Sequence, residues 1–539
     1  MQIVYSQYRG SRSIEHIGSA HCDGQVEVLK AAASARLRRG QGELDLGPGV
    51  AGAPSAGVLA VTGSRMGHLL DAFDRACEVL GFAKATGDDE VFKALVVARI
   101  IEPTSKQDSL RVLDEAGAWC PSYRTVKRRL AGYGGMRRVW VKKAHTDGAQ
   151  DQGVPAGPSP PDGPDGHLVQ VTADEGQWVR VLDPDGGQLR ARLAKACVKH
   201  TQVTTATFVL YDVTTLWFET NKGDGFRESG FSKERRLEPQ ILVGLLTDAA
   251  GFPLMVHAFD GNTAETTTMI PVIEAFCAAH GLKDVVIVAD AGMISEGNKM
   301  AIEKAGWSFI LGAKVLDVPH VIQTWRQTHP GTDIPDGQVF TQPWPAGPKD
   351  KRKDQTLFYT YKADRARRTL HGIDQQVAKA VQAAAGHGAI KRNRFLKLTG
   401  ATKSVNRELE AKARALAGIK GYVTNLPDPD PHLVIGTYAR LVNVEKSFRM
   451  SKSDLAARPI YHHARPQIEA HLTIVFAALA VARWIETTTG WSIRKFVTTT
   501  RRYRTIQIQA GKHTVTAADP LPPDLKAALS KIHDTPPTK

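Results

Sequence analysis

Residues 206–312 alternate strand-like and helical segments in a defined order, and this order constrains the fold more than any other feature. Three β-rich apolar runs come first, followed by a helix, a strand, a second helix and a final strand. The expected strands cover 206–211, 240–246, 252–259, 285–289 and 307–312, and the expected helices cover 266–280 and 295–305. Alternating strands and helices predict an α/β domain in which helices pack against a sheet.

The order β-β-β-α-β-α-β is that of an RNase H-like core. Residues 315–417 break the rhythm with polar and basic segments, strand-like pieces and a long helical stretch, so we interpret them as an inserted domain. A strand at 421–425 and helices at 431–452 and 466–487 then resume the core. The predicted fold class is therefore α/β, with an RNase H-like catalytic core interrupted by a β-containing insertion domain and preceded by a mostly helical N-terminal region.

The chain carries an excess of positive charge. Its 539 residues include 70 Lys and Arg against 55 Asp and Glu, which gives a net charge of +15 and a pI near 9.5. An excess of this size favours an anionic partner, most often a nucleic acid. A generic basic protein is the alternative.

Cysteine usage and hydropathy indicate the compartment. The five cysteines are far apart and form no CxxC pair, which is typical of a reduced cytosolic protein without disulfides or a cysteine zinc site. The N-terminus lacks the apolar core of a signal peptide, and no apolar run is long enough to span a membrane. We therefore expect a cytoplasmic protein without membrane contact.

Two short helical stretches in the N-terminal third, 105–117 and 122–131, are joined by a tight turn. Ser122 is suited to cap the second helix. That helix is basic, with Arg124, Lys127 and Arg128 as the candidate DNA contacts. A basic second helix after a tight turn resembles a DNA-reading helix-turn-helix, and the alternative is a solvated basic face on a small helical bundle.

Three acidic residues stand where an RNase H-like core places carboxylates. Asp212 follows the first apolar strand, Asp290 follows the fourth, and Glu445 lies on a late helix. Strands one and four are neighbours in such a sheet, so Asp212 and Asp290 are expected to meet at adjacent strand ends. A single aspartate at a strand end is usually a turn cap, but three acids in this order favour a metal site. Mg²⁺ is a hard ion that prefers such oxygen ligands.

The residues after Glu445 add cations to this carboxylate. Lys446, Arg449 and Lys452 follow it within seven positions. A spacing of seven is about two helical turns, so Glu445 and Lys452 are expected to project from the same face. A carboxylate that can hold a divalent metal, beside cations that can hold a polyanion, is the pairing that phosphoryl transfer on a nucleic acid needs.

The segment from Tyr438 to Lys452 resembles the Y-(2)-R-(3)-E-(6)-K signature of the bacterial insertion-sequence DDE transposases. Tyr438, Glu445 and Lys452 match it in type and spacing, whereas the arginine position holds Leu441. The neighbouring Arg440 would point about 100° away on a helix. Further stretches that resemble blocks of the same group lie at 230–240, 259–265, 289–295 and 458–462.

The resemblance implies cut-and-paste DNA transposition. A metal-bound water would hydrolyse the phosphodiester at the transposon end, and the freed 3′-hydroxyl would attack target DNA. Two Mg²⁺ ions, with Mn²⁺ as a possible substitute, would be the cofactors. The implied catalytic residues and metal ligands are Asp212, Asp290 and Glu445. Alternatives are an RNase H-like DNA nuclease without strand transfer and a catalytically inactive DNA-binding descendant.

The resemblance also implies partners. Tyr438 and Lys452 would grip DNA phosphates near the scissile bond, with Lys446 and Arg449 as helpers. The partners would be double-stranded DNA, as transposon terminal inverted repeats and target, and a second copy of the chain, since two ends are cut together. The protein would be cytoplasmic and associated with the bacterial nucleoid when bound to DNA. We interpret His462, His463 and His471 as helix-face or phosphate-contact residues, since no ligand-type partner stands at metal spacing.

Seven segments summarise the expected organisation. They are an N-terminal β and loop segment (1–60), a helical, DNA-binding region (61–144), a linker and connecting segment (145–203), the first part of the RNase H-like core (204–314), the insertion domain (315–417), the second part of the core with the catalytic Glu helix (418–490) and a basic, loose C-terminal tail (491–539).

Overall fold

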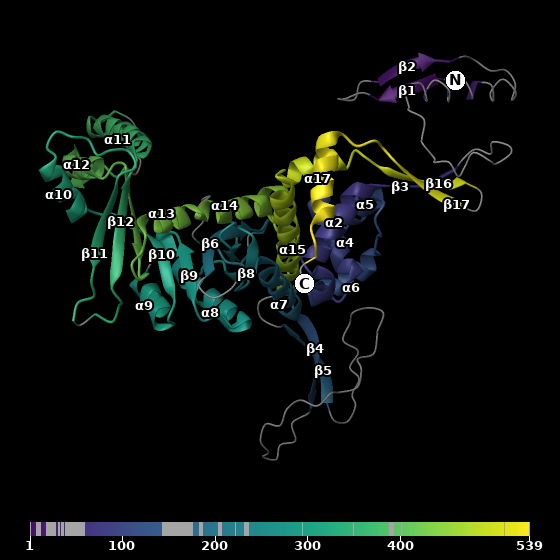
Figure 1. The fold of residues 1–539 in the computed structure, drawn as a ribbon, viewed down its shortest axis with the longest axis horizontal. Helices are drawn as coiled ribbons and strands as arrows, with labels where there is room; N and C mark the ends of the chain where they lie inside the picture. Colours follow the sequence, from purple (N-terminus) through teal and green to yellow (C-terminus); the bar gives the residue numbers. More distant parts are fainter. Residues whose placement is uncertain are drawn as a thin grey trace. The chain divides into compact units, whose positions relative to one another are not determined.

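The computed structural model divides into two compact units, Met1–Ser64 with Thr505–Asp519, and Arg65–Arg504 with Pro520–Lys539 (Figure 1). The first unit holds a β1–β2 hairpin (Gln2–Ser6, Arg12–His16) and a three-stranded sheet in the order β17-β16-β3 (His513–Ala518, Thr505–Ala510, Ala60–Arg65). The residues that the structure describes are 2–6, 12–17, 29–30, 33, 37, 60–142, 176–182, 187–202, 207–220, 222–230, 237–293, 295–348, 350–387, 393–399, 402–510 and 513–537.

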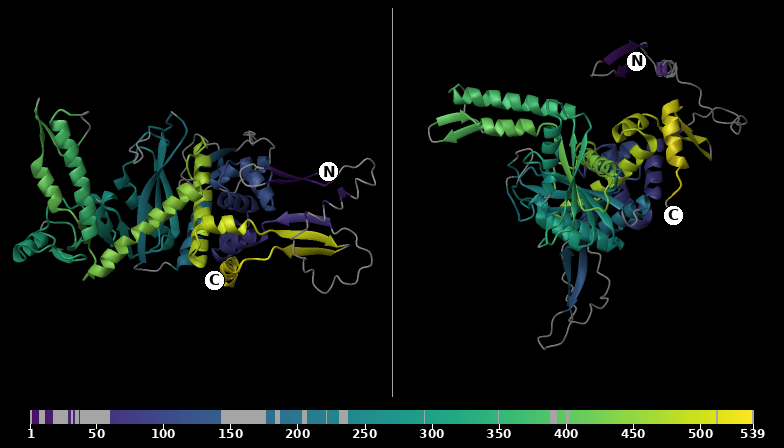
Figure 2. Two further views of the ribbon diagram at one scale, coloured as in Figure 1. Left: turned by 90° about the horizontal axis from the view of Figure 1, so that it is seen from above. Right: turned by 60° about the vertical axis from the view of Figure 1, so that its left-hand side comes forward.

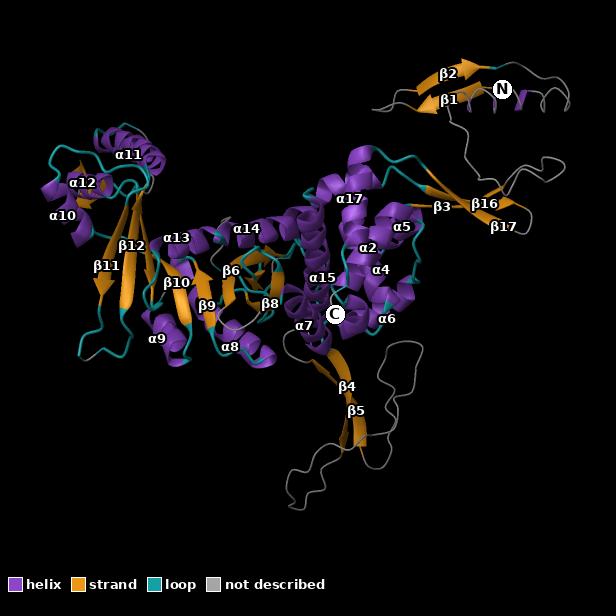
Figure 3. Cartoon of the chain, in the orientation of Figure 1, coloured by secondary structure: helices purple, strands orange, loops and turns teal. Residues whose placement is uncertain are grey.

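An eight-stranded mixed sheet forms the centre of the second unit, in the order β11-β12-β15-β10-β9-β6-β7-β8 (Figure 3). The first strand, β6, pairs antiparallel with β7 and parallel with β9, and β9 pairs parallel with β10. The predicted α/β class and the predicted contact of the first and fourth strands are confirmed. The core strands are β6 (Thr207–Trp217), β7 (Gln240–Thr247), β8 (Pro253–Asp260), β9 (Val285–Ala289), β10 (Ser308–Ala313) and β15 (Ile419–Thr424).

Helices cover both faces of this sheet. Tyr211 of β6 belongs to the apolar cluster that includes Phe276 of α8 (Met269–His280) and Ile302 of α9 (Glu296–Lys304). Leu210 of β6 belongs to a second cluster, on the face covered by α13 (Pro431–Ala439), α14 (Leu441–Arg449) and α15. Alternate strand residues point to opposite faces, so Asp212 shares the face of Leu210 and lies toward α13 and α14.

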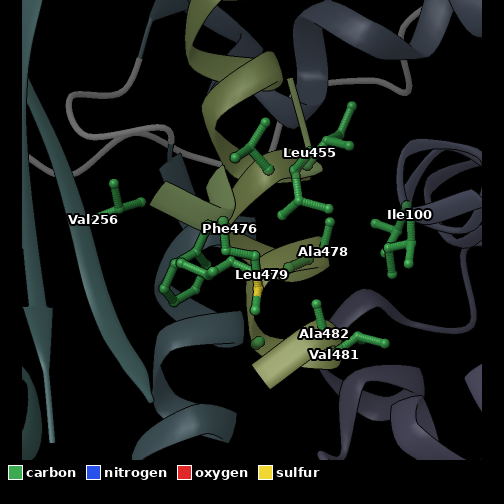
Figure 4. Close-up of a cluster of buried hydrophobic side chains, with 14 of the residues drawn as sticks. Ile100, Val256, Leu455, Phe476, Ala478, Leu479, Val481 and Ala482 are labelled. Carbon is green, nitrogen blue, oxygen red and sulfur yellow. The ribbon is translucent and has the colours of Figure 1, made fainter. Parts of the chain in front are cut away.

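Helix α15 (Arg465–Thr489) joins the sheet to the N-terminal helices. In Figure 4, Val256 of β8 and Ile100 of α4 lie on opposite sides of Phe476 and Leu479 of this helix. α15 is long and apolar enough to cross a membrane, but 94% of its most apolar window is buried inside the protein. This burial is what a central core helix of a folded domain shows, and the helix does not require a lipid environment to explain its composition.

The helical N-terminal region forms as predicted within the described residues. Asp89 caps α4 and also accepts hydrogen bonds from Arg129 and Tyr133 of α6, which ties the two helices together. The predicted cap at Ser122 is confirmed, since its hydroxyl accepts the backbone N–H of Thr125. The helices are α2 (Gly67–Val79), α3 (Phe82–Thr86), α4 (Glu90–Ile101), α5 (Asp108–Ala116) and α6 (Tyr123–Tyr133).

The segment 145–203 was expected to link this region to the core. Helix α7 (Gly187–Thr201) occupies its end, with Leu193 and Cys197 buried. Strand β5 (Gly176–Leu182) pairs with β4 (Met136–Lys142). The Gly- and Pro-rich stretch itself lies outside the described residues. The end of this segment is thus part of the packed fold.

Residues 315–417 divide between the core sheet and an arm. Strands β11 (Val339–Trp344) and β12 (Gln355–Tyr361) extend the central sheet through β15. The arm consists of α11 (Ala363–Ala384), the β13–β14 hairpin (Leu396–Thr399, Thr402–Val405) and α12 (Arg407–Ala415), and it has its own apolar cluster (Figure 2). Helix α10 (His320–Thr328) packs beside β11. Strands β11 and β12 of this segment therefore belong to the core sheet, whereas β13 and β14 belong to the arm.

The C-terminal segment is more ordered than predicted. α16 (Ile493–Thr500) and α17 (Pro523–Asp534) both pack on α15 and α2. Phe496 and Leu525 are fully buried. The expectation of a loose tail over 491–539 is therefore wrong for these helices, because regularly spaced apolar residues within the basic, Pro-rich sequence give each helix a face to bury.

Candidate active site

Asp212 and Asp290 lie side by side at the centre of the sheet. Tyr211 of β6 and Ala289 of β9 are register partners in a parallel pair, so the two aspartates that follow them occupy the same level. Neighbouring strands are about 4.8 Å apart. Asp212 is half-buried and its carboxylate accepts the backbone N–H of Val213 at 2.8 Å, whereas Asp290 is exposed at the strand end. The prediction that Asp212 and Asp290 lie at adjacent strand ends is therefore confirmed.

Tyr438 of α13 holds Asp290 from above the sheet. Its hydroxyl donates a hydrogen bond of 2.5 Å to Asp290. The tyrosine is buried, and its ring meets that of Tyr422 edge-on at 5.0 Å between centroids. Burial first, and then Asp290, raise the pKa of Tyr438 well above its usual range, so the phenol keeps its proton. Tyr438 was predicted to grip phosphate, and in this structure its contact is to a carboxylate.

Gly312 makes the approach of Tyr438 possible. Leu311 of β10 is the register partner of Ala289, which places Gly312 next to Asp290. A Cβ on Gly312 would lie 2.5 Å from the Tyr438 hydroxyl and 3.1 Å from the backbone nitrogen of Ala291. Sequence reasoning did not identify this residue. The available signal was a glycine inside an apolar strand, which often marks a close approach.

Lys420 of β15 is a second residue that sequence reasoning missed. Its Nζ lies 4.5 Å from the centre of the Tyr438 ring and 5.7 Å from that of Tyr422. Burial and the nearby Arg365 lower the pKa of Lys420, while Asp290 and Glu445 act in the opposite direction. Lys420 is therefore a half-buried cation within electrostatic reach of two of the three predicted metal ligands. The sequence signal was a lysine within a short apolar strand.

Helix α14 carries Glu445 over the same face of the sheet. Side chains of Asn443 and Ser447 donate to the carbonyls of Ala249 and Gly251 at 3.0 and 2.6 Å, which anchor the helix to the β7–β8 turn. Glu445 itself is exposed, as are Lys446 and Arg449. Among the described residues, no three His, Cys, Asp or Glu side chains are close enough to form a complete metal centre. The structure thus pairs Asp212 with Asp290 on the sheet, and Glu445 lies on the helix that covers their face.

The predicted helix 431–452 is broken twice. α13 ends before Arg440, and Met450–Asp454 is π-helical, with the N–H of Leu455 bonded to the carbonyl of Met450. A π-helical turn holds more residues than an α-helical turn, so it changes the direction in which later side chains point. The segment that carries Glu445 and Lys452 is therefore not one continuous α-helix, and their common face stays a prediction.

Lys452 lies near Thr214 and Leu216 of β6, which share the sheet face of Asp212. It is half-buried and lines a cavity of about 30 Å³ with Leu216, Val243 and Phe476. Its predicted role as a phosphate contact stays a prediction.

The arginine position of the signature is occupied by Leu441, and the neighbouring Arg440 lies at the junction of α13 and α14. Leu441 packs on the apolar core, partly buried. Arg440, between α13 and α14, is exposed beside an open hollow of about 520 Å³ that Thr207 and Asp248 also line. An arginine is thus present on the surface near the expected place, on the α13–α14 junction.

The predicted DNA contacts on α6 lie on its surface. Arg124, Lys127 and Arg128 are exposed, and Lys127 lies over the exposed ring of Tyr123 at 5.7 Å from its centroid. Their role as DNA contacts stays a prediction.

Residues 204–481 match the family described as Transposase DDE domain, and this match covers just over half of the chain. The chain belongs to that family of transposases. The predicted DDE transposase family and its enzyme class are therefore confirmed. No curated protein matches the transposase. A cryo-EM structure of the piggyBac transposase synaptic complex with hairpin DNA is 11% identical, with a TM-score of 0.34. The likeness covers 57% of this chain and 54% of the piggyBac chain. The present chain therefore spans about half the length of the piggyBac transposase.

The donor chemistry of the transposase site suits a hard divalent cation. Asp212 and Asp290 offer carboxylate oxygens at one level of the sheet, and Asp290 is open to solvent. Tyr438 donates to one oxygen of Asp290, and the backbone N–H of Val213 donates to one oxygen of Asp212, so both carboxylates are held in place. Carboxylates of this kind are the ligands that Mg²⁺ uses in proteins.

Proposed function

We propose that this transposase cuts a DNA phosphodiester at the end of an insertion sequence and joins the freed 3′-hydroxyl to target DNA. One observation carries the proposal, namely that Asp212 and Asp290 occupy one level of neighbouring parallel strands within the family-matched segment. Carboxylates held on a rigid sheet give the fixed geometry that in-line displacement at phosphorus needs.

The residues that would hold metal are Asp212, Asp290 and Glu445. Bound Mg²⁺, or Mn²⁺ in its place, would lower the pKa of water and stabilise charge on the phosphate oxygens. The α14 helix lies over the sheet face to which Asp212 points, which supports Glu445 as the third ligand. The side chain of Glu445 is exposed and would turn toward the two aspartates to complete the set.

The other residues of the site would position the reacting groups. Tyr438 fixes one oxygen of Asp290 and thereby orients the other. Lys446 and Arg449 are exposed on α14 and are available to phosphates of the DNA backbone. Lys420 supplies positive charge between Asp290 and Glu445. Charge of this sign beside the acids favours entry of an anionic substrate.

The partners follow from the reaction. Two element ends must be cut and joined together, so we propose a homodimer on double-stranded DNA carrying terminal inverted repeats. Exposed Arg124 and Lys127 on α6 would contact the DNA away from the cleavage site. The protein would act on the bacterial chromosome in the cytoplasm.

An end-labelled duplex carrying the element's terminal repeat, incubated with a second target duplex, tests the proposal. We expect cleavage and joined product with Mg²⁺ or Mn²⁺, and loss of both in Asp290→Ala and Asp212→Asn. Asp284→Ala is the matched control, because Asp284 is exposed in the turn before β9. Cleavage without joined product would identify a nuclease instead. Binding without cleavage by the wild-type chain would identify an inactive descendant.

A further inference from the structure

Cationic and imidazole side chains gather where the N-terminal helices meet the loop before α15. They come from α4, the turn that follows it, α6 and the loop before α15. We define the α4 cationic cluster as Arg99 of α4, Lys106 of the following turn, Lys127 of α6, and His462 of the loop before α15. None of these residues belongs to the acidic site on the sheet.

The packing beneath this cluster is firm. α4 and α6 both pack on α15, and Ile100, next to Arg99, is part of their shared apolar core (Figure 4). His471 of α15 is 5% exposed and donates from Nε2 to the carbonyl of Ala457 at 3.1 Å. The His462 ring lies 5.6 Å from that of His471. The cluster is therefore supported by core elements that fix where its charges lie.

The cluster has no acidic partner within the part of the chain that the structure describes. Arg99, Lys106 and His462 make no ion pair or side-chain hydrogen bond to any described residue, although all three are half-buried. Other arginines of the same region differ, since Arg111 and Arg129 both bond to carboxylates. A half-buried charge without a partner is costly unless a ligand compensates it.

The neighbours of each group reinforce this charge imbalance. Burial, then Lys106 and Arg99, lower the pKa of His462 to about 4. Burial lowers the pKa of Arg99 to about 10, and burial followed by Lys127 lowers that of Lys106. Like charges have thus been brought together at the cost of their own solvation. An anion with several acceptor oxygens would attract the cations Arg99, Lys106 and Lys127 and offset their mutual repulsion.

We propose that the α4 cationic cluster binds a backbone phosphate of duplex DNA, at a site separate from the carboxylates. This inference rests on the proposed function, because it supplies a second contact on the same substrate. The exposed cations Arg124 and Arg128 continue from Lys127 along α6, and Tyr461 beside His462 is 64% exposed. A stripe of this kind fits a polymer with repeated phosphates rather than one small anion.

Under this proposal, removing the cations of the cluster should raise the stability of the free protein and lower its affinity for DNA. In the absence of DNA, the positive charges of the cluster repel one another. The double variant Arg99→Gln with Lys106→Gln removes two of these charges, so its thermal midpoint is expected to rise by about 1–2 °C. The same double variant should bind DNA more weakly. A merely structural pair would behave otherwise, because its removal would lower the midpoint and leave DNA affinity unchanged.

The experiment uses the full chain and a 40-bp duplex carrying the terminal repeat. Affinity is measured from 50 to 200 mM salt by fluorescence anisotropy, without divalent metal. Each phosphate contact contributes about −0.9 to the slope of log affinity against log salt. We expect the slope of Arg99→Gln with Lys106→Gln to be less negative by about two, with affinity at least about tenfold lower at low salt. Arg99→Lys should retain most of the binding.

The matched control is Lys283→Gln with Lys304→Gln, which removes two exposed cations near the opposite face of the sheet. Two results in the Arg99 and Lys106 variant would overturn this inference: an unchanged salt slope of DNA affinity, or a lowered thermal midpoint with unchanged affinity. If the wild-type chain still cleaves DNA, the proposed function would stand. A wild-type chain that neither binds nor cleaves the duplex would overturn the proposed function and this inference with it.

Discussion

The hydroxyl of Tyr438 donates a 2.5 Å hydrogen bond to Asp290, which is 148 positions earlier in the chain. The bond joins α13 to the end of β9 and fixes one oxygen of a predicted metal ligand. It depends on Gly312, which leaves room for the tyrosine hydroxyl. Three elements are therefore needed to set the direction of one carboxylate.

Tyr438→Phe is expected to lower DNA cleavage about 10- to 100-fold, the usual scale for losing a partner of a metal ligand. The ring stays, so the packing on Tyr422 is retained and the free energy of unfolding should fall by only about 1 kcal/mol. Cleavage rates at several Mg²⁺ concentrations and chemical denaturation measure the two effects. Tyr359→Phe is the matched control, because Tyr359 is a buried tyrosine of β12 that packs in a separate apolar cluster. Full activity in Tyr438→Phe would remove the positioning role.

Gly312→Ala is expected to displace Tyr438 and to destabilise the fold by about 1–3 kcal/mol, since its Cβ would lie 2.5 Å from the hydroxyl. Gly436→Ala gives the contrast, because nothing lies within 4 Å of a Cβ at this α13 position. Removing a helical glycine should stabilise by about 0.5–1 kcal/mol. Urea unfolding of both variants is the measurement, and equal effects of the two would contradict the close approach.

Lys420→Gln is expected to tighten Mn²⁺ binding about three- to tenfold, the scale of a screened charge interaction near a protein surface. The reason is that Lys420 places a positive charge within reach of Asp290 and Glu445. Mn²⁺ titration followed by electron paramagnetic resonance measures this affinity directly. Lys304→Gln, an exposed lysine on α9, should leave it unchanged. Weaker Mn²⁺ binding in Lys420→Gln would show that the lysine does not oppose the metal.

A buried ion pair joins Arg190 of α7 to Glu469 of α15, with 2.9 Å between the guanidinium nitrogen and the carboxylate oxygen. Each of the two residues is 3% exposed. Glu469→Ala is expected to destabilise by about 3–5 kcal/mol, because it leaves a buried guanidinium without its partner. Replacing both residues with Met and Leu should recover most of that loss. A double-mutant cycle in urea measures it, and additive effects of the two changes would argue against coupling.

Acidification is expected to destabilise the protein. Burial and nearby cations hold the pKa of His462 at about 4 and that of His471 well below its usual range. The unfolded chain therefore binds more protons below pH ~6.5, so stability falls as pH decreases through the window from ~6.5 to ~4. Arg99, Lys106 and His463 face these rings. The thermal midpoint measured from pH 7 to 5 should fall less steeply in His462→Gln with His471→Gln; an identical slope would contradict the assignment.

The sequence was informative where apolar runs end in acids. The strand 285–289 is observed with the predicted bounds, because five consecutive buried residues leave no competing periodicity. Asp212 and Asp290 could be paired in advance because parallel neighbours place successive residues at one level. The predicted pairing of the first and fourth strands was therefore enough to place Asp212 next to Asp290.

Other features depend on contacts that a linear pattern does not contain. The π-helix at Met450–Asp454 has the composition of an ordinary helix, so the sequence did not indicate where the α-helix ends. Gly312 is required only because Tyr438, distant in sequence, packs against it. The joining of β11 and β12 to the core sheet likewise depends on pairing with β15, which follows them by about sixty residues.

The position of α15 has a practical consequence for protein expression. The family match ends at residue 481, inside this helix, whose sides are covered by α4, α6 and α17 as well as by β8. A fragment cut at either end of the match would expose a long apolar surface to water and invite aggregation. The recombination domain therefore cannot be purified apart from the helices that surround it, and loss of the N-terminal region should abolish solubility before it affects DNA recognition.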